Sequence, residues 1–339
     1  MSAEEEKTLT PASGQQLAIV SATPHLRTHR TTQAIMLDVC LALIPAVAAS
    51  VWCFGTRALI VMLFAVISCV AFEAITRIAL KRAQTVQDLS AVVTGLLLGM
   101  NLPPTLPLWM IPIGSFAAIV VVKQLFGGIG QNFANPAITA RIVLMLSFPT
   151  QMTSWNAANG HAWGADAASA ATPMKALTAN ELGAFSGDDL PSILDMFVGR
   201  HGGSLGETCA VALLLGAIYL CVFRVITPLI PCFYIGTVAV ITFIAGGFDA
   251  QFTIYHLLGG GLILGACFMA TDYATSPVNW KGKIVFAIGC GILTSLIRLF
   301  GSMPEGVSFS ILLMNLLVPH IENLTAPRTF GKERKRHAK

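Results

Sequence analysis

Hydroxyl-bearing side chains in a short polar stretch near the middle of the chain are the first residues that could do chemistry. The stretch reads DAASAATP, runs from Asp166 to Pro173, and contains Ser169, Ala171 and Thr172. Taken alone, a segment rich in Ser, Ala and Thr is more typical of a plain linker than of a site. Whether the stretch is a linker or a site depends on the apolar segments that surround it.

A few ionisable side chains inside or beside apolar segments form a second set. Glu207, followed by Thr208, opens the apolar segment after the polar stretch, where a helix dipole stabilises an acid. Such an acid fits either a simple helix start or a contact with a bound cofactor. Arg141 lies within a short apolar segment, where a guanidinium could bind an anionic cofactor or a carboxylate. Asp272 follows a Gly-rich apolar segment and is a candidate ligand for a cation or a second cofactor.

The composition identifies an integral membrane protein. Of 339 residues, 55% are hydrophobic and only 11% are charged, whereas a soluble domain has roughly 25% charged residues. Because a bilayer core about 30 Å thick needs about 20 helical residues, we expect an all-α fold with about ten transmembrane helices. The expected spans are 34–54, 58–80, 86–101, 108–126, 135–149, 205–223, 226–246, 254–270, 283–300 and 307–321.

Helix breakers interrupt two of these spans, and the chain repeats itself weakly. Pro103 and Pro104 follow the third span, and Asn135-Pro136 begins the fifth. The sequence GLLLGMNLPP in the third span is similar to GLILGACFMATDYATSP in the eighth. Short or broken helices at matching places are typical of internal repeats that enclose a buried site, although Gly-rich apolar helices also resemble one another by chance. We therefore predict two five-helix repeats.

The Gly-rich turn GGIGQN before the fifth span presents backbone N–H groups at the start of a short helix. Such a turn suits a bound ligand and the packing of broken helices equally well. Asp38 and Glu73 are expected to lie at the inner headgroups, because a charge deeper in the membrane is costly. None of the eight cysteines belongs to a CxxC motif or a Cys/His cluster, so the chain predicts no zinc or iron–sulfur site of its own.

Basic residues predict the orientation of the chain in the membrane. With the N-terminus inside, most of the 21 Lys and Arg fall on the cytoplasmic side, so both termini are expected there and the long polar loop outside. The basic end is expected to be a solvated anchor and not a nucleic-acid-binding tail. We predict a cytoplasmic N-terminal segment, a first five-helix repeat, an extracytoplasmic loop, a second five-helix repeat and a cytoplasmic tail: 1–33, 34–149, 150–204, 205–321 and 322–339.

Four segments of the chain resemble the D subunit of Rnf complexes. DAASAATP resembles the flavinylation motif Asp-x-x-(Ser/Thr)-Gly-Ala-Thr, in which the final Thr is esterified to the phosphate of FMN, although Ala170 stands where the motif has Gly. The segments SATPHLRTHRTTQAIMLDVCLALIPA, GGIGQNFANPAITAR and GSLGETCAVALLLGAIYL also resemble that subunit, so the similarity extends from Ser21 to Pro319. The B subunit of the sodium-translocating NADH:quinone reductase is similar too, but it usually has a longer N-terminal extension.

The resemblance implies a membrane electron-transfer subunit of an ion-translocating ferredoxin:NAD oxidoreductase in a bacterial inner membrane. It implies FMN bound covalently through a phosphoester to Thr172 on the extracytoplasmic side, and it allows a second, non-covalent flavin such as riboflavin. The implied partners are the A, B, C, E and flavin-bearing G subunits, membrane lipid, and a flavin transferase that attaches FMN. The other candidate cofactor contacts are Asp166, Ser169, Ala171, Glu207, Thr208, Arg141 and Asp272.

Two other functions fit parts of the sequence. Five-plus-five spans with broken helices are also used by secondary transporters, although a carrier has no need of a tethering loop. A passive scaffold that only seats partner subunits is the third interpretation. The chain has no nucleotide motif for NAD, so no complete active site is expected in it alone. The sequence does not distinguish Na⁺ from H⁺ or fix the direction of electron flow.

Overall fold

Every regular element in the described part of the chain is a helix. The computed structural model describes residues 30–154, 191–207, 209–301 and 306–326. The helices belong to a single compact unit, Thr32–Lys339. We call its residues 32–154 the first half and its residues 191–326 the second half.

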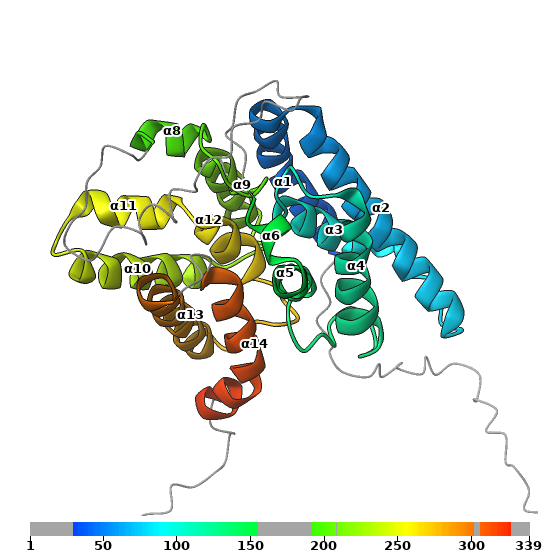
Figure 1. Cartoon of the computed structure of the whole chain (residues 1–339). Coiled ribbons are helices and arrows are strands. Elements are labelled where there is room, and N and C mark those ends of the chain that lie inside the picture. Colours follow the sequence, from blue (N-terminus) through cyan, green and yellow to red (C-terminus); the bar gives the residue numbers. More distant parts are fainter. Residues whose placement is uncertain (1–29, 155–190, 208, 302–305, 327–339) are drawn as a thin grey trace, which may run out of the picture. The chain divides into compact units, whose positions relative to one another are not determined.

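The first half consists of two long helices followed by shorter ones (Figure 1). In chain order, its elements are α1 (Thr32–Phe54), α2 (Thr56–Ala79), η1 (Val86–Asp88), α3 (Ser90–Met100), η2 (Leu108–Met110), α4 (Ile111–Phe116), η3 (Ala117–Gln124), α5 (Pro136–Ser147) and α6 (Pro149–Met152). Of these, η1 and η2 are 3₁₀ turns, and η3 is a π-helix that continues α4.

The second half begins with shorter helices and ends with two long ones. Its elements are α8 (Ile193–Val198), α9 (Ala210–Val222), α10 (Leu229–Ala245), α11 (Ala250–Leu258), α12 (Leu262–Leu264), η5 (Gly265–Met269), α13 (Trp280–Phe300) and α14 (Gly306–Thr325). The π-helix η5 continues α12, and this pair meets α11 at a bend of 61°.

The helices of the described residues are consistent with a multi-pass membrane protein. Four of them, α1, α2, α13 and α14, are long and apolar enough to cross a bilayer, and the bent pair of α11 with α12–η5 is a fifth candidate. The shorter apolar helices are Ser90–Met100, Leu108–Gln124, Pro136–Ser147, Ala210–Val222 and Leu229–Ala245. The prediction of an all-helical integral membrane protein is thus confirmed, whereas the number of ten spans and the internal repeat stay predictions.

Local sequence explains where the helices break. Gly55 has φ 72° and separates α1 from α2, and Gly260 and Gly261 have φ 69° and 65° at the break before α12. These left-handed conformations are easy only for glycine. Asn135 caps α5 by accepting hydrogen bonds from the backbone N–H groups of the next turn, and Pro136 occupies the first helical position, where it needs no N–H partner.

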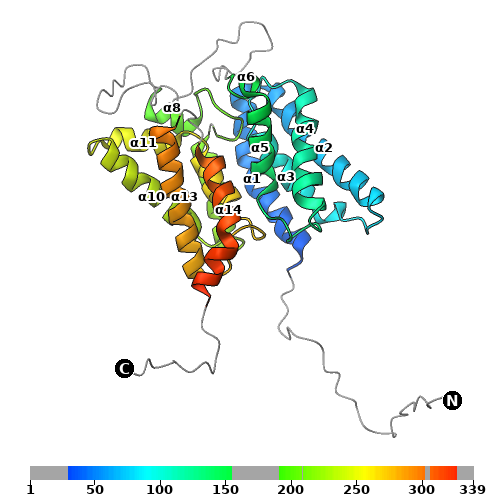
Figure 2. The same ribbon diagram turned by 60° about the horizontal axis from the view of Figure 1, so that its bottom comes forward.

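The two halves contact each other through helices that are far apart in the sequence. In Figure 2 the first-half helices lie on the right, and α10, α11, α13 and α14 lie on the left. Across the two halves, α1 packs against α9 and α5 packs against α14. The first turn of α1 and the last turn of α14 are at the lower end of this view, whereas α6 and α8 are at the upper end. The unit therefore presents its first and last helical turns at the same end.

The helix pair α2 and α3 packs so closely that one position admits only glycine. A Cβ atom on Gly95 of α3 would lie 2.6 Å from the Cα of Val66 and 2.9 Å from the carbonyl oxygen of Ala65, both on the backbone of α2. Small residues at such crossings let helix backbones approach, which is the main way that helices associate in a membrane.

We predict that Gly95→Ala destabilises the protein by about 1–3 kcal/mol, because backbone atoms cannot yield to the added methyl group. The measurement is thermal unfolding of the purified chain in detergent. Gly236→Ala is the matched control, since Gly236 is also helical and a Cβ there meets nothing within 4 Å. Equal melting temperatures for the two variants would contradict the close packing of α2 and α3.

Candidate functional site

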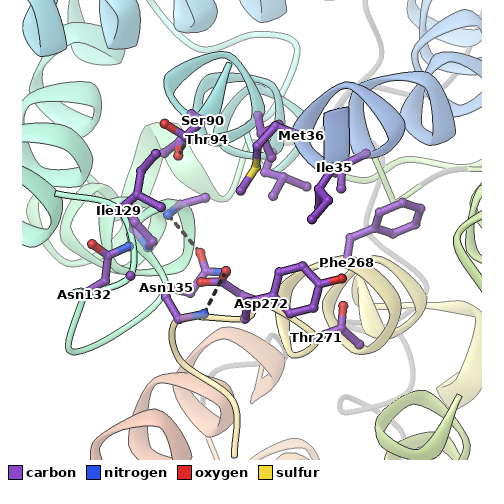
Figure 3. A pocket seen from close by; sticks show the side chains of 18 of the residues that line it. Ile35, Met36, Ser90, Thr94, Ile129, Asn132, Asn135, Phe268, Thr271 and Asp272 are labelled. Atoms are coloured by element: carbon purple, nitrogen blue, oxygen red, sulfur yellow. Dashed lines mark hydrogen bonds between the residues drawn. The ribbon is translucent and has the colours of Figure 1, made fainter. Parts of the chain in front are cut away.

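A cavity of about 100 Å³ lies between the two halves. Figure 3 shows its lining, in which Ile35, Met36 and Phe268 provide apolar surface. Its polar lining residues come from both halves: Ser90, Thr94, Lys123, Asn132, Asn135, Thr271 and Asp272. The volume exceeds that needed for a single water molecule several-fold. The cavity is therefore large and polar enough to hold several water molecules or a small polar ligand.

Asparagine side chains fix the floor of this cavity. The side-chain nitrogen of Asn135 donates to the carbonyl oxygen of Met269 at 3.1 Å, which joins α5 to the end of η5. The side chain of Asn315 on α14, oriented with its nitrogen toward Thr275, donates to the Thr275 carbonyl and accepts from the Asn135 backbone N–H, both at 3.1 Å. Both asparagines are buried. These bonds tie α5, α14 and the turn after η5 together.

Asp272 lies in the cavity wall, as the sequence suggested for a cation or cofactor ligand. Its carboxylate accepts a 3.2 Å hydrogen bond from the Thr275 hydroxyl and a longer one from the backbone N–H of Ala274. Burial raises the pKa of Asp272, and these two hydrogen bonds act in the opposite direction. The acid is thus held at the cavity wall by hydrogen bonds within its own turn.

The Gly-rich turn between η3 and α5 forms a second wall. Gly127, Gly128 and Gly130 have φ values of 124°, 111° and 84°, which explains why the turn is built from glycine. Asn132 lines the cavity, and its buried side-chain oxygen has no hydrogen-bond partner among the described residues. A buried amide oxygen without a partner is costly. The turn therefore holds one polar atom at a cost in free energy, beside the cavity that Asn132 lines.

A buried ion pair stands behind the same cavity. The ammonium of Lys123, at the end of η3, is 2.7 Å from the carboxylate of Glu73 on α2, and the two side chains are 2% and 0% exposed. Glu73 is thus buried within the protein beside its partner, and the expectation that it lies at the level of the inner headgroups stays a prediction. Lys123 lines the cavity, and sequence reasoning missed it. The signal that could have found it was a Lys at the end of one apolar helix together with an acid inside another.

Arg141 lies at the breaks of the interrupted helices and not in the cavity wall. Its guanidinium donates to the side-chain oxygen of Asn101 at 2.7 Å, just after the end of α3. It also lies beside Gly261, at the break between α11 and α12. Arg298 has a similar role in the second half, where it donates to the carbonyl groups of Gly259 and Gly260 at 3.0 Å. The structure therefore brings Arg141 to helix ends and not next to Asp272.

The segment from His201 to Glu207 is buried although it is not helical. The backbone N–H of Gly206 donates to the carbonyl of Met100 at 2.6 Å, and that of Leu205 donates to Leu102 at 3.1 Å. The carboxylate of Glu207 accepts a 2.9 Å bond from Ser204. Glu207 is thus held inside a folded turn against the end of α3, at the start of the chain that leads into α9.

His201 belongs to the same buried turn, and both of its ring nitrogens are without a hydrogen-bond partner among the described residues. Burial lowers the pKa of His201, whereas the Glu207 carboxylate and both the backbone and the carboxylate of Asp195 act in the opposite direction. The imidazole is therefore held in its neutral form more strongly than a histidine in water.

Five of the predicted site residues are not among those that the structure describes. They are Asp166, Ser169, Ala171, Thr172 and Thr208. Their assignment as flavin-bearing or flavin-contacting residues stays a prediction from the sequence.

Comparison with known proteins shows strong similarity over most of the chain. The model of the NQR2, RnfD, RnfE family matches residues 19–331. The D subunit of the Na⁺-translocating ferredoxin:NAD⁺ oxidoreductase complex of Acetobacterium woodii is 47% identical over 92% of this chain and 95% of that protein. The D subunit of the proton-translocating ferredoxin:NAD⁺ oxidoreductase complex of Clostridium ljungdahlii is 44% identical over 93% of this chain and 96% of that protein. The D subunit of the ion-translocating oxidoreductase complex of Stutzerimonas stutzeri is 41% identical over 88% of this chain and 92% of that protein.

We predict that the buried imidazole of His201 makes the fold sensitive to acid. Because the pKa of His201 is lower in the folded chain than in the unfolded chain, the unfolded state takes up the proton more readily. Stability is therefore expected to fall as the pH drops below about 6.5, the ordinary value for histidine. The measurement is the melting temperature of wild type and His201→Gln between about pH 7.5 and pH 5.5, with a smaller acid loss expected in the variant. His320→Gln, at an exposed histidine on α14, should retain the wild-type slope. A His201→Gln slope identical to that of wild type would be evidence against the assignment.

Proposed function

The chain belongs to the NQR2, RnfD, RnfE family, and we propose that it is the membrane electron-transfer D subunit of an ion-translocating ferredoxin:NAD oxidoreductase complex. The observation that carries the proposal is the family match over nearly the whole chain, together with relatives that are themselves named as D subunits. The remaining subunits of the complex are the expected partners. The chain serves as one electron carrier within that assembly, and we find no nucleotide motif for NAD in its sequence.

The first cofactor of the proposal is FMN bound covalently to Thr172. The motif DAASAATP around Thr172 supports it. A phosphoester to a threonine leaves the flavin ring unmodified, and a tether replaces a binding equilibrium by a high effective concentration. Such a tether suits a cofactor on the side of the membrane away from the cytoplasm, where a released flavin would be lost. A separate transferase would have to attach the FMN.

The arrangement of helix ends supports an extracytoplasmic position for the flavin-bearing loop. The chain leaves α6 and re-enters at α8 at the same end of the unit, opposite to the start of α1 and the end of α14 (Figure 2). If both termini are cytoplasmic, as the basic residues predict, residues 155–190 connect helices on the outer side. The buried turn that contains Glu207 leads directly into α9 and lies next to Thr208 in the chain.

A second, non-covalent flavin is proposed for the cavity between the halves. Ile35, Met36 and Phe268 in the lining would offer apolar contact to a ring, and the side chain of Asn132 also lines the cavity. Asp272 and Asn135 complete the polar lining. A bound flavin supplies one- or two-electron redox chemistry, while these residues hold it, orient it and keep water away.

The transported ion is left open by the proposal. The two relatives of nearly equal similarity are named for different ions, Na⁺ in one and the proton in the other. Overall identity therefore does not select between them.

We predict that Thr172→Ala abolishes the covalent flavin. The chain is produced with a flavin transferase, separated on a denaturing gel and inspected for flavin fluorescence, and its intact mass is measured. Wild type should fluoresce and carry the added mass of one FMN less water on the peptide with Thr172. Thr178→Ala, shortly after the motif in the same loop of the sequence, is the matched control and should remain fluorescent. A fluorescent Thr172→Ala band would reject the attachment site.

We predict that Asn132→Leu lowers the retention of the non-covalent flavin at least about tenfold, because one lost hydrogen bond to a buried group is worth about 1–3 kcal/mol. Flavin is extracted from the purified chain with acid and quantified, using the Thr172→Ala background so that no covalent flavin contributes. Asn323→Leu replaces an exposed asparagine at the end of α14 and should leave retention unchanged. Unaltered flavin content in Asn132→Leu would place the second flavin elsewhere.

A further inference from the structure

An exposed stripe of aliphatic side chains runs along one face of α2. Its members recur three or four positions apart, which places them on the same side of a helix; we call Ile60, Leu63, Ile67, Ala71, Ile75 and Ile78 the α2 stripe. Near the end of the helix the exposure is greatest, at 61% for Ile75 and 68% for Ile78. Figure 1 shows the last turns of α2 at the edge of the unit. The α2 stripe is therefore open to the surrounding membrane in the described part of the chain.

The α2 stripe differs in composition from the face of α2 that contacts other helices. That contact face has small and hydroxyl-bearing residues, such as Ala65 beside Gly95 of α3 and Ser68, which bonds to Ser115 of α4 at 2.6 Å. Small residues and hydroxyls are what helix contacts inside a membrane usually require. Apart from Ala71, the α2 stripe consists of Ile and Leu. Its chemistry suits acyl chains better than a partner helix.

Two basic residues follow directly at the end of this stripe. The side chains of Lys81 and Arg82 are exposed. The guanidinium of Arg82 donates to the carbonyl of Gln124 at 3.2 Å, which uses one of its five N–H donors. No other hydrogen bond or ion pair of these two side chains lies within the described residues. The acid nearest in α2, Glu73, is already paired with Lys123 at 2.7 Å. Both positive charges are therefore available to an anion.

The turn after α2 holds this basic pair in place. Lys81 has φ 51°, a left-handed conformation that the end of a helix usually gives to glycine. The buried guanidinium of Arg77 donates to the carbonyl of Ala83 at 3.1 Å, and the backbone N–H of Arg82 donates to the carbonyl of Arg77 at 2.9 Å. A lysine thus occupies a position where glycine would be easier, and Arg77 acts as a positioning residue for the turn.

We propose that Lys81 and Arg82 bind the headgroup phosphate of an anionic phospholipid, with an acyl chain along the α2 stripe. The stripe from Ile67 to Ile78 is about 16 Å long at about 1.5 Å per residue, which is about half of a bilayer core about 30 Å thick. One leaflet therefore matches the length between the basic pair and the middle of the helix. Arginine binds phosphate through two parallel hydrogen bonds, and lysine adds a second charge. The site does not depend on either flavin of the proposed function.

The test is native mass spectrometry of the purified full chain in detergent with equal amounts of phosphatidylglycerol and phosphatidylcholine that have the same acyl chains. Wild type should retain phosphatidylglycerol about tenfold or more over phosphatidylcholine, because each basic residue near an anionic lipid favours binding about fivefold. Lys81→Gln combined with Arg82→Gln should abolish this preference. Lys281→Gln combined with Lys283→Gln removes the same charge at the start of α13 and should retain the wild-type preference.

A second variant and a soluble competitor separate folding and simple anion binding from lipid binding. Lys81→Gln alone should lose several-fold of the preference while its melting temperature in lipid-free detergent stays that of wild type, since its side chain makes no bond within the described residues. Glycerol phosphate, which has the headgroup charge without acyl chains, should not displace the lipid at equal concentration. Equal displacement would assign the site to a free phosphate. No preference in wild type, an unchanged preference in the double variant, or an equal loss in the Lys281 and Lys283 control would overturn the site.

The occupant of the α2 stripe is tested in native membranes with a phosphatidylglycerol that carries a photoreactive group on its acyl chain. It should crosslink to the peptide that contains Ile75 and Ile78 more strongly than the matching photoreactive phosphatidylcholine. Crosslinking of the purified chain without crosslinking in native membranes would show that a partner subunit covers the stripe, and would reject lipid as its occupant.

Discussion

The constraint on which this structure depends is that every interrupted helix inside an apolar medium must find internal partners for its free backbone groups. Water is absent from the core of a bilayer, so unsatisfied carbonyl and N–H groups there are expensive. The protein meets the constraint with a few buried side chains that reach across to helix ends. Asn135 caps α5, and Arg298 donates hydrogen bonds to the carbonyl groups of Gly259 and Gly260 after the end of α11. Arg141 reaches Asn101, the residue at the end of α3.

The cavity between the halves is a consequence of these interruptions. Continuous helices would fill the space between α1, α3, α5 and the second half, whereas helices that stop part-way leave polar ends that converge on it. The π-helical segments η3 and η5 contribute to the same effect, since each ends at or near the lining with residues such as Lys123 and Phe268. Local widening of a helix is often found at functional sites. Polar side chains are tolerated here because they line a shared space and do not face lipid.

The proposed function places two flavins at separate positions of one chain, one at Thr172 and one in the cavity. The motif with Thr172 belongs to the loop that connects α6 and α8, whereas the cavity lies beside the Gly-rich turn and the pair of Glu73 and Lys123. Glu73 and Lys123 are near the C-terminal ends of α2 and η3, which are expected on the cytoplasmic side. A subunit that carries one flavin at each place could link carriers on the two sides of the membrane. In this proposal the tether prevents the loss of FMN, whereas the cavity sets the environment of the second flavin ring.

The amino-acid sequence by itself determined the class of the protein and the position of its helix breaks. Its apolar composition requires helices, and Pro103, Pro104, Asn135-Pro136 and the Gly-rich turn forbid continuous ones, because these residues act through their own backbone. The motif around Thr172 and the family resemblance also needed no fold. Asp272 was found as a candidate because it follows a helix break.

Only the tertiary structure decided which side chains meet. Glu73 and Lys123 are 50 residues apart on helices whose rotation the sequence does not specify, so nothing in their local patterns paired them. Arg141 has the character of an anion-binding residue in the sequence, yet the packing of α3 against α5 gives it Asn101 instead. The sequence alone fits Asn132 either to a turn or to a ligand contact. The structure adds that its side-chain oxygen is buried and has no hydrogen-bond partner among the described residues. Contacts between distant helices depend on the rotation and crossing of whole helices, and that information is spread over many residues and is not held in any one motif.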